Sequence, residues 1–366
     1  MLDGHYCRLR QERLLERLRQ RELDAVVCAA THHVYYFTGH WTFWQQQSGF
    51  VLFADGRSSL ISADRPAEGA AADELRAYEA TWMGTQRQEQ PAAVAQKVIE
   101  ALGARKAGRV GIDASAVSSQ VAARFHGGID VIDEDLFQLR RRKDADELEL
   151  MKMAIRCCEG MYQRAREILL PGVAELHVFN ELHAAAVEAA GEPLSGMLGN
   201  DYACGVGGGP ARKKRVAKGG ELYILDLGPA YRGYFSDNAR TFSVDGKPTD
   251  TQMKAWEAVV GCHTVVEEMA RPGARCRDIF QAADEFLKQK GYKGMAHHLG
   301  HGVGLQPHEF PHLNLRWDDV LMEGEVFTAE PGVYDEDLRA GIRIENDYLV
   351  TDKGVVNLLN TPMEMV

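Results

Sequence analysis

The sequence lacks the features that mark membrane-spanning, secreted and nucleic-acid-binding proteins. No apolar stretch approaches the ~18 residues that a membrane-spanning helix requires. The arginine- and glutamate-rich N-terminus has no apolar core of a secretory signal. Acidic residues outnumber basic ones by 53 to 42, and the net charge of −11 opposes contact with a phosphate backbone. We therefore expect neither a membrane nor a nucleic-acid partner.

The arrangement of the cysteines does not indicate a disulfide framework. The seven cysteines form no Cys-x-x-Cys pair, and Cys157 and Cys158 are neighbours in a helical pattern. An odd and scattered set of this kind is typical of reduced thiols. The cysteines therefore favour a cytoplasmic protein.

The length of 366 residues corresponds to about two domains. In the first part, helical patterns alternate with short apolar runs, and Asp24–Ala30 and Val34–Thr38 are predicted strands. This alternation predicts a smaller α/β domain over residues 1–140. A long helical pattern begins after the basic run Arg140–Lys143. A second domain is therefore expected over residues 141–366.

The second domain contains two copies of one pattern. Each copy has a Pro-Gly pair, a phenylalanine eight residues later and a glycine about twenty residues later: Pro171-Gly172, Phe179 and Gly191, then Pro272-Gly273, Phe280 and Gly291. Coincidence is the alternative, because helix–Pro-Gly–helix is a common arrangement. The matching landmarks favour a duplicated α+β half, with a site where the halves meet.

Two aspartates interrupt apolar strands of the first copy. Asp226 breaks the run Ile224–Gly228, and Asp237 follows eleven residues later. In a hairpin that turns at Tyr231-Arg232, positions whose numbers sum to 463 face each other, so these aspartates would be direct cross-strand neighbours. Opposed carboxylates repel each other unless a cation lies between them. Either aspartate alone could cap a turn, but the pair predicts a cation site.

The second copy has a pair of glutamates and a histidine in comparable places. Glu330 ends a predicted strand, and Glu345, fifteen residues later, begins the return strand. His301 lies in the run His297–Gly304, whose glycines allow close approach of another backbone. A lone histidine is usually an ordinary core or surface residue. A histidine that accompanies four unexplained acids is a candidate metal ligand.

The chemistry of this donor set favours transition metals. Four carboxylates with one imidazole suit Mn, Fe, Co or Zn better than Ca, which prefers oxygen ligands alone. Four negative charges offset two divalent cations, and such a pair of cations can activate water for hydrolysis of an amide-like bond. A binding module without activity would not need to keep these five residues together.

These residues and their contexts resemble the pita-bread metallopeptidases, the family of aminopeptidase P, prolidase and methionine aminopeptidase, with creatinase as a metal-free relative. The matching motifs are LDLG, GYFSDNARTF, GHGVGLQPHEFP, FTAEPGVY and GIRIEND. The resemblance covers residues 144–365, and residues 24–135 resemble the creatinase-type N-terminal domain. It implies an α+β pita-bread catalytic domain with a duplicated half, preceded by a smaller α/β domain. It also implies a hydrolase of the Xaa-Pro aminopeptidase or prolidase type that acts on small peptides.

The resemblance implies a role for each matching residue. The ligands of two divalent transition metal ions, with manganese favoured over cobalt, zinc or iron, would be Asp226, Asp237, His301, Glu330 and Glu345. Glu330 would also take the proton of the attacking water. His297 and His308 would contact the substrate or the tetrahedral intermediate, as catalytic and substrate-binding residues. Arg343 would be a substrate-binding arginine.

One position departs from the peptidase pattern. Those peptidases have a histidine about 17 residues before the first aspartate ligand, where this sequence has Gly209. Loss of that histidine would weaken Xaa-Pro cleavage, unless Arg212 or another nearby cation supplies the missing donor. The alternative substrate is therefore a small amide, an amidine or another metabolite, as in creatinase. The glycine-rich loop could equally be an ordinary solvated loop.

The resemblance also implies a homodimer. In the family, an N-terminal loop approaches the active site of the partner subunit, and the corresponding residues here are His40, Trp41, Phe43 and Trp44. Aromatic residues beside a glycine on an irregular loop make good interface contacts. These residues could equally be part of the core of their own domain.

Overall fold

The computed structural model describes residues 1–42, 45–65, 68–125 and 128–365, and for residues 197, 198 and 200 it describes the backbone alone. The chain divides into two compact units, Met1–Arg140 and Arg141–Val366. Among the described residues, every helix is too short or too polar to cross a membrane.

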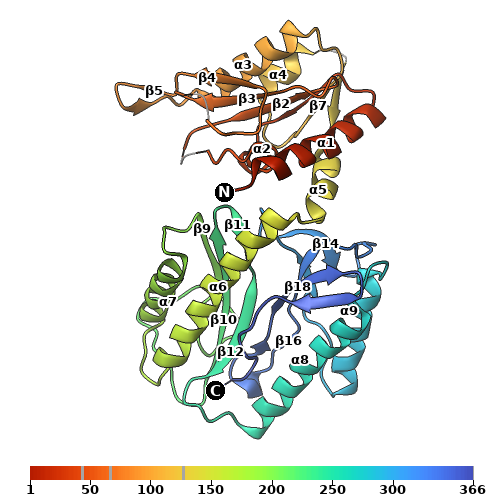
Figure 1. Ribbon diagram of the computed structural model, residues 1–366. Helices are drawn as coiled ribbons and strands as arrows, with labels where there is room; N and C mark the ends of the chain where they lie inside the picture. Colours follow the sequence, from red (N-terminus) through yellow and green to blue (C-terminus); the bar gives the residue numbers. More distant parts are fainter. Residues whose placement is uncertain (43–44, 66–67, 126–127, 366) are drawn as a thin grey trace. The chain divides into compact units, whose positions relative to one another are not determined.

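The first unit is built on a six-stranded mixed sheet with the order β4-β3-β2-β1-β7-β8 (Figure 1). Strands β1, β2 and β3 pair antiparallel, whereas β7, β8 and β4 extend the sheet in parallel pairs. The strands are β1 (Ala25–Cys28), β2 (Gly49–Phe53), β3 (Ser58–Ala63), β4 (Glu74–Tyr78), β7 (Val110–Ile112) and β8 (Ile129–Val131), with a separate hairpin of β5 (Thr81–Trp82) and β6 (Thr85–Gln86).

Helices cover this sheet and complete its core. Val94 and Val98 of one helix, α3, are buried in the same apolar cluster as Val27 and Val51 of the sheet. The helices are α1 (Gly4–Gln20), α2 (Thr31–Thr38), α3 (Gln90–Ala104), α4 (Ser119–Arg124) and α5 (Asp133–Arg141). The alternation of helices and strands confirms the α/β class that the sequence predicted for this part of the chain.

The predicted strand Val34–Thr38 is wrong, because these residues form α2. The aromatic and β-branched composition favours a strand, but tertiary contacts override that preference. The buried carboxylate of Asp113 accepts hydrogen bonds from the backbone N–H groups of Ala29 and Ala30, where the helix begins, and contacts His33 Nδ1 at 3.1 Å. Gly39 then ends the helix in the left-handed conformation.

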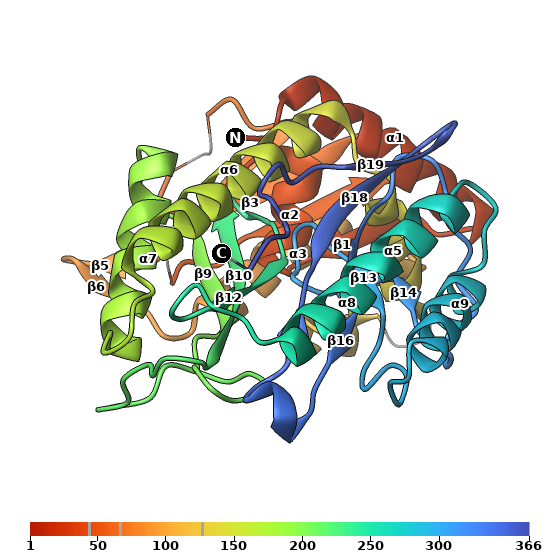
Figure 2. The ribbon, with the colours of Figure 1, turned by 90° about the horizontal axis from the view of Figure 1, so that it is seen from below.

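The second unit consists of two similar halves. In the first half, helices α6 (Ala145–Ile168) and α7 (Glu175–Ala190) pack on a sheet in which β10 pairs with β9, β11 and β12. In the second half, α8 (Asp250–Met269) and α9 (Cys276–Gln289) pack on a five-stranded sheet with the order β14-β13-β15-β18-β19. Figures 1 and 2 show each helix pair beside its own strands.

The strands of the second unit are short, apart from the central strand β10. The first half has β9 (Gly196–Asp201), β10 (Leu222–Tyr231), β11 (Tyr234–Phe235) and β12 (Asn238–Ser243). The second half has β13 (Gly300–Gly302), β14 (Glu309–Leu313), β15 (Val326–Ala329), β18 (Asn346–Thr351) and β19 (Gly354–Asn357). Between β15 and β18 along the chain lie the small hairpin of β16 (Gly332–Val333) and β17 (Ile342–Arg343) and the 3₁₀ helix η1 (Glu336–Leu338).

The same backbone hydrogen bonds recur in both halves and confirm the duplication. After the first Pro-Gly pair, Gly172 N donates to Ala217 O at 2.7 Å. After the second, Gly273 N donates to Leu321 O at 2.9 Å. The return bonds also correspond, because Ala217 N donates to Val173 O and Leu321 N donates to Ala274 O. In each half, the link between the two helices is therefore bonded in the same way to the segment that precedes the next strand, β10 or β15.

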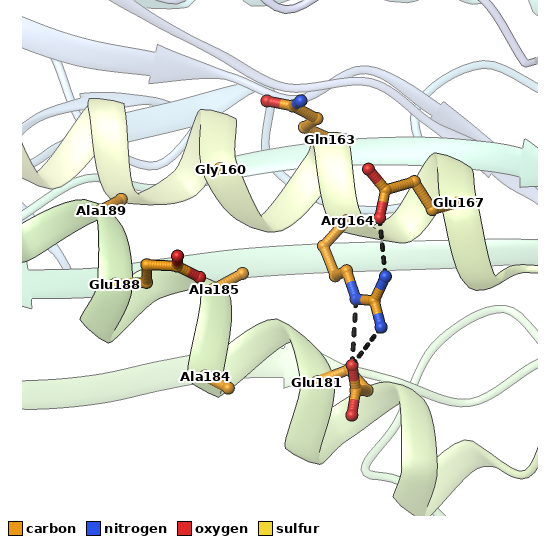
Figure 3. Close-up of a pocket in the computed structure, with 9 residues that line it drawn as sticks. All are labelled: Gly160, Gln163, Arg164, Glu167, Glu181, Ala184, Ala185, Glu188 and Ala189. Carbon is orange, nitrogen blue, oxygen red and sulfur yellow. Dashed lines mark hydrogen bonds and ion pairs between the residues drawn. The ribbon is translucent and has the colours of Figure 1, made fainter.

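Helices α6 and α7 pack closely because their contact is lined by small residues. A Cβ atom at Gly160 would lie 3.3 Å from Ala189 Cβ. Figure 3 shows the pocket along this contact, where the guanidinium of Arg164 lies between two glutamates. Its Nε donates to Glu181 of α7 at 3.0 Å, and its Nη1 donates to Glu167 at 2.6 Å. The pocket thus belongs to the helix packing and contains none of the predicted site residues.

Glycines on both sides of His301 allow β13 to lie against its neighbours. A Cβ atom at Gly302 would stand 1.9 Å from Phe310 O, and one at Gly300 would stand 1.8 Å from Thr328 O. Both obstacles are backbone atoms of the adjacent strands, so a side chain at either position must displace a strand. The close backbone approach that the glycine spacing predicted is therefore present.

We predict that Gly302→Ala lowers the free energy of unfolding by roughly 3 kcal/mol, the upper range for overpacking. The measurement is urea unfolding followed by circular dichroism. The control is Gly103→Ala in α3, where no heavy atom lies within 4 Å of the added methyl group. An unchanged stability of Gly302→Ala would contradict the tight strand contact.

Candidate metal centre

The two halves of the second unit are joined by hydrogen bonds between β12 and residues 343–345 of the second half. Glu345 N donates to Ala239 O at 2.9 Å. The hydroxyl of Thr241 both donates to Arg343 O and accepts from Arg343 N, each at 3.0 Å. This junction brings the acidic segments of the two halves side by side.

The five predicted metal ligands converge at this junction from five separate segments. All five are buried, with between 1 and 7% of their surface exposed. They are Asp226 on β10, Asp237 before β12, His301 on β13, Glu330 after β15 and Glu345 before β18.

The imidazole of His301 is oriented to present a lone pair to the acids. Its Nδ1 lies 3.0 Å from Gly302 O and therefore carries the proton, which leaves Nε2 free to bind a cation. Nε2 lies 3.6 Å from Glu330 Oε1 and 3.9 Å from Asp237 Oδ2. Ligand atoms of His301, Glu330 and Glu345 lie within 4.8 Å of one another. Burial lowers the pKa of His301 to about 4, so the ring is neutral.

The predicted register of the aspartate hairpin is wrong, because the turn lies one residue later in the chain than predicted. The paired residues of β10 and β12 have numbers that sum to 465 rather than 463, and Asp226 faces Ala239. The turn is formed by Arg232-Gly233, both with positive φ, which is the two-residue geometry that a glycine permits. Asp237 therefore lies two residues before Ala239, the partner of Asp226. This spacing places it on the same face of the sheet as Asp226. The aspartates are diagonal rather than direct neighbours.

The glutamate hairpin has the spacing that the sequence predicted. Ala329 pairs with Asn346, and Gly332 pairs with Arg343, so the same register runs through β15–β18 and β16–β17. Glu330 and Glu345 occupy facing positions in that register. The second half thus presents two carboxylates from opposite strands of one hairpin.

Burial and mutual repulsion raise the pKa values of three of the four acids well above their usual range. For Asp226, burial is the largest cause, followed by the charges of Asp237 and Glu330. For Asp237 and Glu345, burial is again first, followed by neighbouring carboxylates. Burial alone would also raise the pKa of Glu330, but a hydrogen bond from His298 and the charge of that histidine outweigh burial and lower it.

The residues of this cluster fit a pair of divalent cations. Asp226 Oδ1 and Glu345 Oε2 are buried without a hydrogen-bond partner among the residues that the structure describes. Buried carboxylate oxygens normally have a partner, because an unpartnered charge in the interior is costly. A donor set of four carboxylates and one neutral imidazole matches Mn, Fe, Co or Zn. Metal ions would supply both the missing partners and the opposite charge.

The histidines predicted to contact substrate lie around this cluster. The ring of His308 stacks on that of His301 with 3.7 Å between centroids. His297 Nε2 lies 2.9 Å from the hydroxyl of Tyr334, and its Nδ1 lies 2.8 Å from His298 O. His308 is exposed to solvent, whereas the ligand acids are buried.

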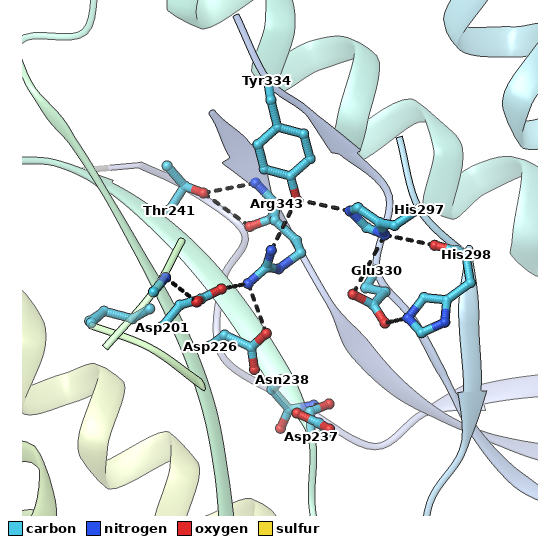
Figure 4. A network of polar contacts seen from close by, with 12 residues as sticks. Asp201, Asp226, Asp237, Asn238, Thr241, His297, His298, Glu330, Tyr334 and Arg343 are labelled. Atoms are coloured by element: carbon cyan, nitrogen blue, oxygen red, sulfur yellow. Dashed lines mark hydrogen bonds and ion pairs between the residues drawn. The ribbon is translucent and has the colours of Figure 1, made fainter. Parts of the chain in front are cut away.

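Arg343 is the cation that lies among the acids (Figure 4). Its Nη2 donates to Asp226 Oδ2 at 2.8 Å and also donates to Asp201 Oδ2. Its Nη1 donates to the hydroxyl of Tyr334 at 3.0 Å, and that hydroxyl contacts His297. A continuous polar network therefore runs from β9 through Arg343 to the histidine segment.

Gly209, at the position that departs from the peptidase pattern, has a backbone conformation that favours glycine. Gly209 has φ = +124°, a conformation that a histidine rarely adopts. Its N–H donates to the carboxylate of Asp201. Arg212 does not provide a replacement donor at the cluster, because its Nη2 donates to Glu175 and to Cys204 O, each at 2.6 Å.

Three polar residues of the site were not predicted from the sequence. Asp201 is a lone acid in the sequence, and it reaches the cluster only because β9 pairs with β10. Tyr334 follows Glu330 by four residues but stands outside any apolar periodicity. His298 lies next to His297 in the histidine run, and its Nε2 is 2.7 Å from Glu330 Oε1. Only the repeated histidine gave a signal that sequence analysis could have used.

The aromatic loop of the first unit is described in part. Trp41 packs its ring edge-on against Tyr35 with 4.9 Å between centroids, and burial lowers the pKa of His40. Phe43 and Trp44 lie outside the described residues. The interface role predicted for this loop therefore stays a prediction.

Comparison with known proteins agrees with this geometry. Residues 149–352 match metallopeptidase family M24, and residues 10–135 match the creatinase/prolidase N-terminal domain. A relative named Xaa-Pro dipeptidase, from Pyrococcus furiosus, is 29% identical over 98% of this chain and 99% of its own length.

Solved structures show the same fold along nearly the whole chain. The structure of an Xaa-Pro dipeptidase from Bacillus anthracis has a TM-score of 0.84 at 22% identity, covering 98% of this chain and 99% of its own. That of an X-Pro aminopeptidase from Thermotoga maritima has a TM-score of 0.81 at 24% identity, covering 97% and 98%. The expected pita-bread fold with an additional N-terminal domain is confirmed. Because the family match spans more than half of its residues, this chain belongs to metallopeptidase family M24.

Proposed function

We propose that this chain is a dinuclear metal-dependent peptidase that cleaves Xaa-Pro bonds in small peptides. The observation that carries this proposal is the convergence of four buried carboxylates and one neutral imidazole at the junction of the two halves. The names of relatives that match along the whole chain support the Xaa-Pro substrate.

The metal ligands that we propose are the five residues whose donors meet at this junction. Two divalent cations bound there would supply the activation of a water molecule for attack on an amide carbonyl. Manganese is our favoured metal, because the donors are mostly carboxylate oxygens, and cobalt, zinc and iron are alternatives. The proposed ligands are Asp226, Asp237, His301, Glu330 and Glu345.

The catalytic roles that we propose follow from what each side chain contacts. Glu330 accepts the proton of the attacking water, since the hydrogen bond and charge of His298 lower its pKa and keep the carboxylate ionised. His308 is exposed beside His301 and donates a hydrogen bond to the carbonyl oxygen of the substrate as negative charge develops. His297 and Arg343, connected through Tyr334, bind and orient the peptide.

A peptide substrate is better supported than a small amide or amidine. The case for a small metabolite rested on Gly209, which lacks the imidazole of the peptidase pattern. Gly209 instead donates its backbone N–H to Asp201, which contacts Arg343, so this loop is part of the polar network of the site. The relatives that match along the whole chain are named as peptidases.

Two further properties belong to this proposal. We propose a homodimer, in which the loop with His40 and Trp41 contributes to the partner's site, on the strength of the family resemblance. We also propose a cytoplasmic location, since all seven cysteines are free and buried and so need no oxidising compartment.

The proposed substrate is tested with manganese-loaded protein on Xaa-Pro dipeptides, Xaa-Pro tripeptides, matched Xaa-Ala peptides and small amides. We expect kcat/KM to be highest on Xaa-Pro peptides, and Asp237→Ala and Glu345→Ala to be folded but inactive, because each removes a ligand charge from the cluster. Arg212→Ala is the control, since its guanidinium is bound to Glu175, and it should retain kcat/KM within about threefold. Equal rates on Xaa-Ala peptides or faster cleavage of small amides would contradict the proposed substrate.

His308→Ala is expected to lower kcat by about 10²–10³-fold without a change in metal content, because it removes one hydrogen-bond donor from the developing oxyanion. The measurements are steady-state kinetics and elemental analysis of the same samples. His308→Gln, which keeps an N–H donor, should recover part of the rate. Loss of bound metal in His308→Ala would instead make His308 a ligand, which its distance from Asp237 and His301 permits.

A further inference from the structure

The residue that faces Asp226 across the sheet is a third aspartate, Asp201. Strands β9 and β10 pair antiparallel, and Asp201 and Asp226 are direct cross-strand partners. Both are buried, with 8 and 7% of their surface exposed. Two carboxylates in facing positions repel each other. A single guanidinium nitrogen, Arg343 Nη2, donates to both and offsets that repulsion.

Backbone groups fix the carboxylate of Asp201 from the opposite side. Gly209 N donates to Asp201 Oδ1, and Gly209 O accepts from Tyr202 N at 2.8 Å. A Cβ atom at Gly208 would stand 2.7 Å from Asp201 Oδ2. Gly208 and Gly209 of the glycine-rich run therefore lie against this carboxylate, and Gly209 sits where the peptidase pattern has a histidine.

Asp201 is the end of a chain of contacts that reaches the substrate-facing residues. Arg343 Nη1 donates to the hydroxyl of Tyr334 at 3.0 Å, and this hydroxyl contacts His297 Nε2 at 2.9 Å (Figure 4). The guanidinium is thus held at one end by Asp201 and at the other by Tyr334. Its Nη2 also donates to Asp226, a proposed metal ligand.

A bound cation would change what Arg343 can contact. Asp226 would be engaged as a metal ligand, and positive charge would lie next to the guanidinium. Asp201 would then be the carboxylate that still pairs with Arg343 and offsets its charge. Without the negative charge of Asp201, the guanidinium would pair with Asp226 alone and would compete with the cation for that carboxylate.

We propose that Asp201 is a positioning residue that pairs with Arg343 when metal is bound, so that the guanidinium does not compete with the cation for Asp226. The proposal rests on the metal centre of the proposed function, and it adds a residue to which neither the sequence pattern nor the family resemblance gave a role. Asp201 acts through Arg343 and touches neither substrate nor metal itself. Its contribution to metal binding therefore depends on the presence of the arginine.

The test is a double-mutant cycle on manganese affinity, measured by competition with a chromogenic chelator and without substrate. Asp201→Asn should weaken manganese binding about 10–100-fold, the usual effect of losing an outer-shell partner. Arg343→Ala should bind manganese at least as tightly as the wild type, because it removes a competing positive charge. In the Arg343→Ala background, Asp201→Asn should change the affinity by less than about threefold.

Two further variants complete the experiment. Gly208→Ala crowds the Asp201 carboxylate without removing its charge, through the added methyl group and through strain at its φ of +145°. It should weaken manganese binding in the same arginine-dependent way, even where Asp201→Asn does not fold. Glu192→Gln is the matched control, because it breaks an ion pair with Arg232 outside the network and should leave the affinity unchanged.

Equal weakening by Asp201→Asn with and without Arg343 would overturn the proposal, because it would show that the aspartate does not act through the arginine. Unchanged affinity in both Asp201→Asn and Gly208→Ala would overturn it as well. The cycle needs no peptidase activity. An arginine-dependent effect in a protein that fails to cleave Xaa-Pro peptides would therefore support this inference while contradicting the proposed substrate.

Discussion

The repulsion among buried carboxylates is the constraint on which the rest of this structure depends. Four acids meet at the junction of the two halves, and Asp201 faces one of them across the sheet. Arg343 donates hydrogen bonds to two of these acids and His298 contacts Glu330, whereas His301 is kept neutral by burial. These two groups cannot offset so many carboxylates, and burial together with the neighbouring carboxylates raises the pKa values of Asp226, Asp237 and Glu345. Divalent cations would supply the missing positive charge.

The duplicated fold explains how the chain can remain folded with such a cluster of buried acids. Each half has its own apolar core between a helix pair and a sheet, so packing within the halves is independent of the acids. The acids lie on β10 and in the segments next to β12, β15 and β18, fixed by hydrogen bonds such as Glu345 N to Ala239 O. The site can therefore carry unfavourable charge while the surrounding halves remain well packed.

Much of this arrangement could be predicted from the sequence, because it depends on local spacing. The odd spacing of Glu330 and Glu345 predicted facing positions in a hairpin, and the observed register agrees. The aspartate hairpin was predicted with a shifted register, since the turn could not be placed from apolar spacing alone and Gly233 determines it. The helix α2 was missed because its buried contacts with Asp113 are distant in sequence.

Asp201 could not be found from the sequence for a related reason. Its role depends on the pairing of β9 with β10 and on the reach of an arginine 142 residues further along the chain. Neither leaves a periodic pattern. The same holds for the glycine-rich run, whose composition departs from the peptidase pattern and makes sense only when the loop is seen to close on a carboxylate.

Calorimetric titration of chelator-stripped protein with manganese tests the central claim most directly. We expect two ions to bind per chain in the wild type and one in Glu345→Ala, because a ligand carboxylate and its negative charge are lost. Binding should be tighter at pH 8 than at pH 6, since the raised pKa values of the ligand acids mean that protons compete with the metal at the lower pH. A wild-type chain that binds no manganese, or binds it equally after Glu345→Ala, would contradict the account.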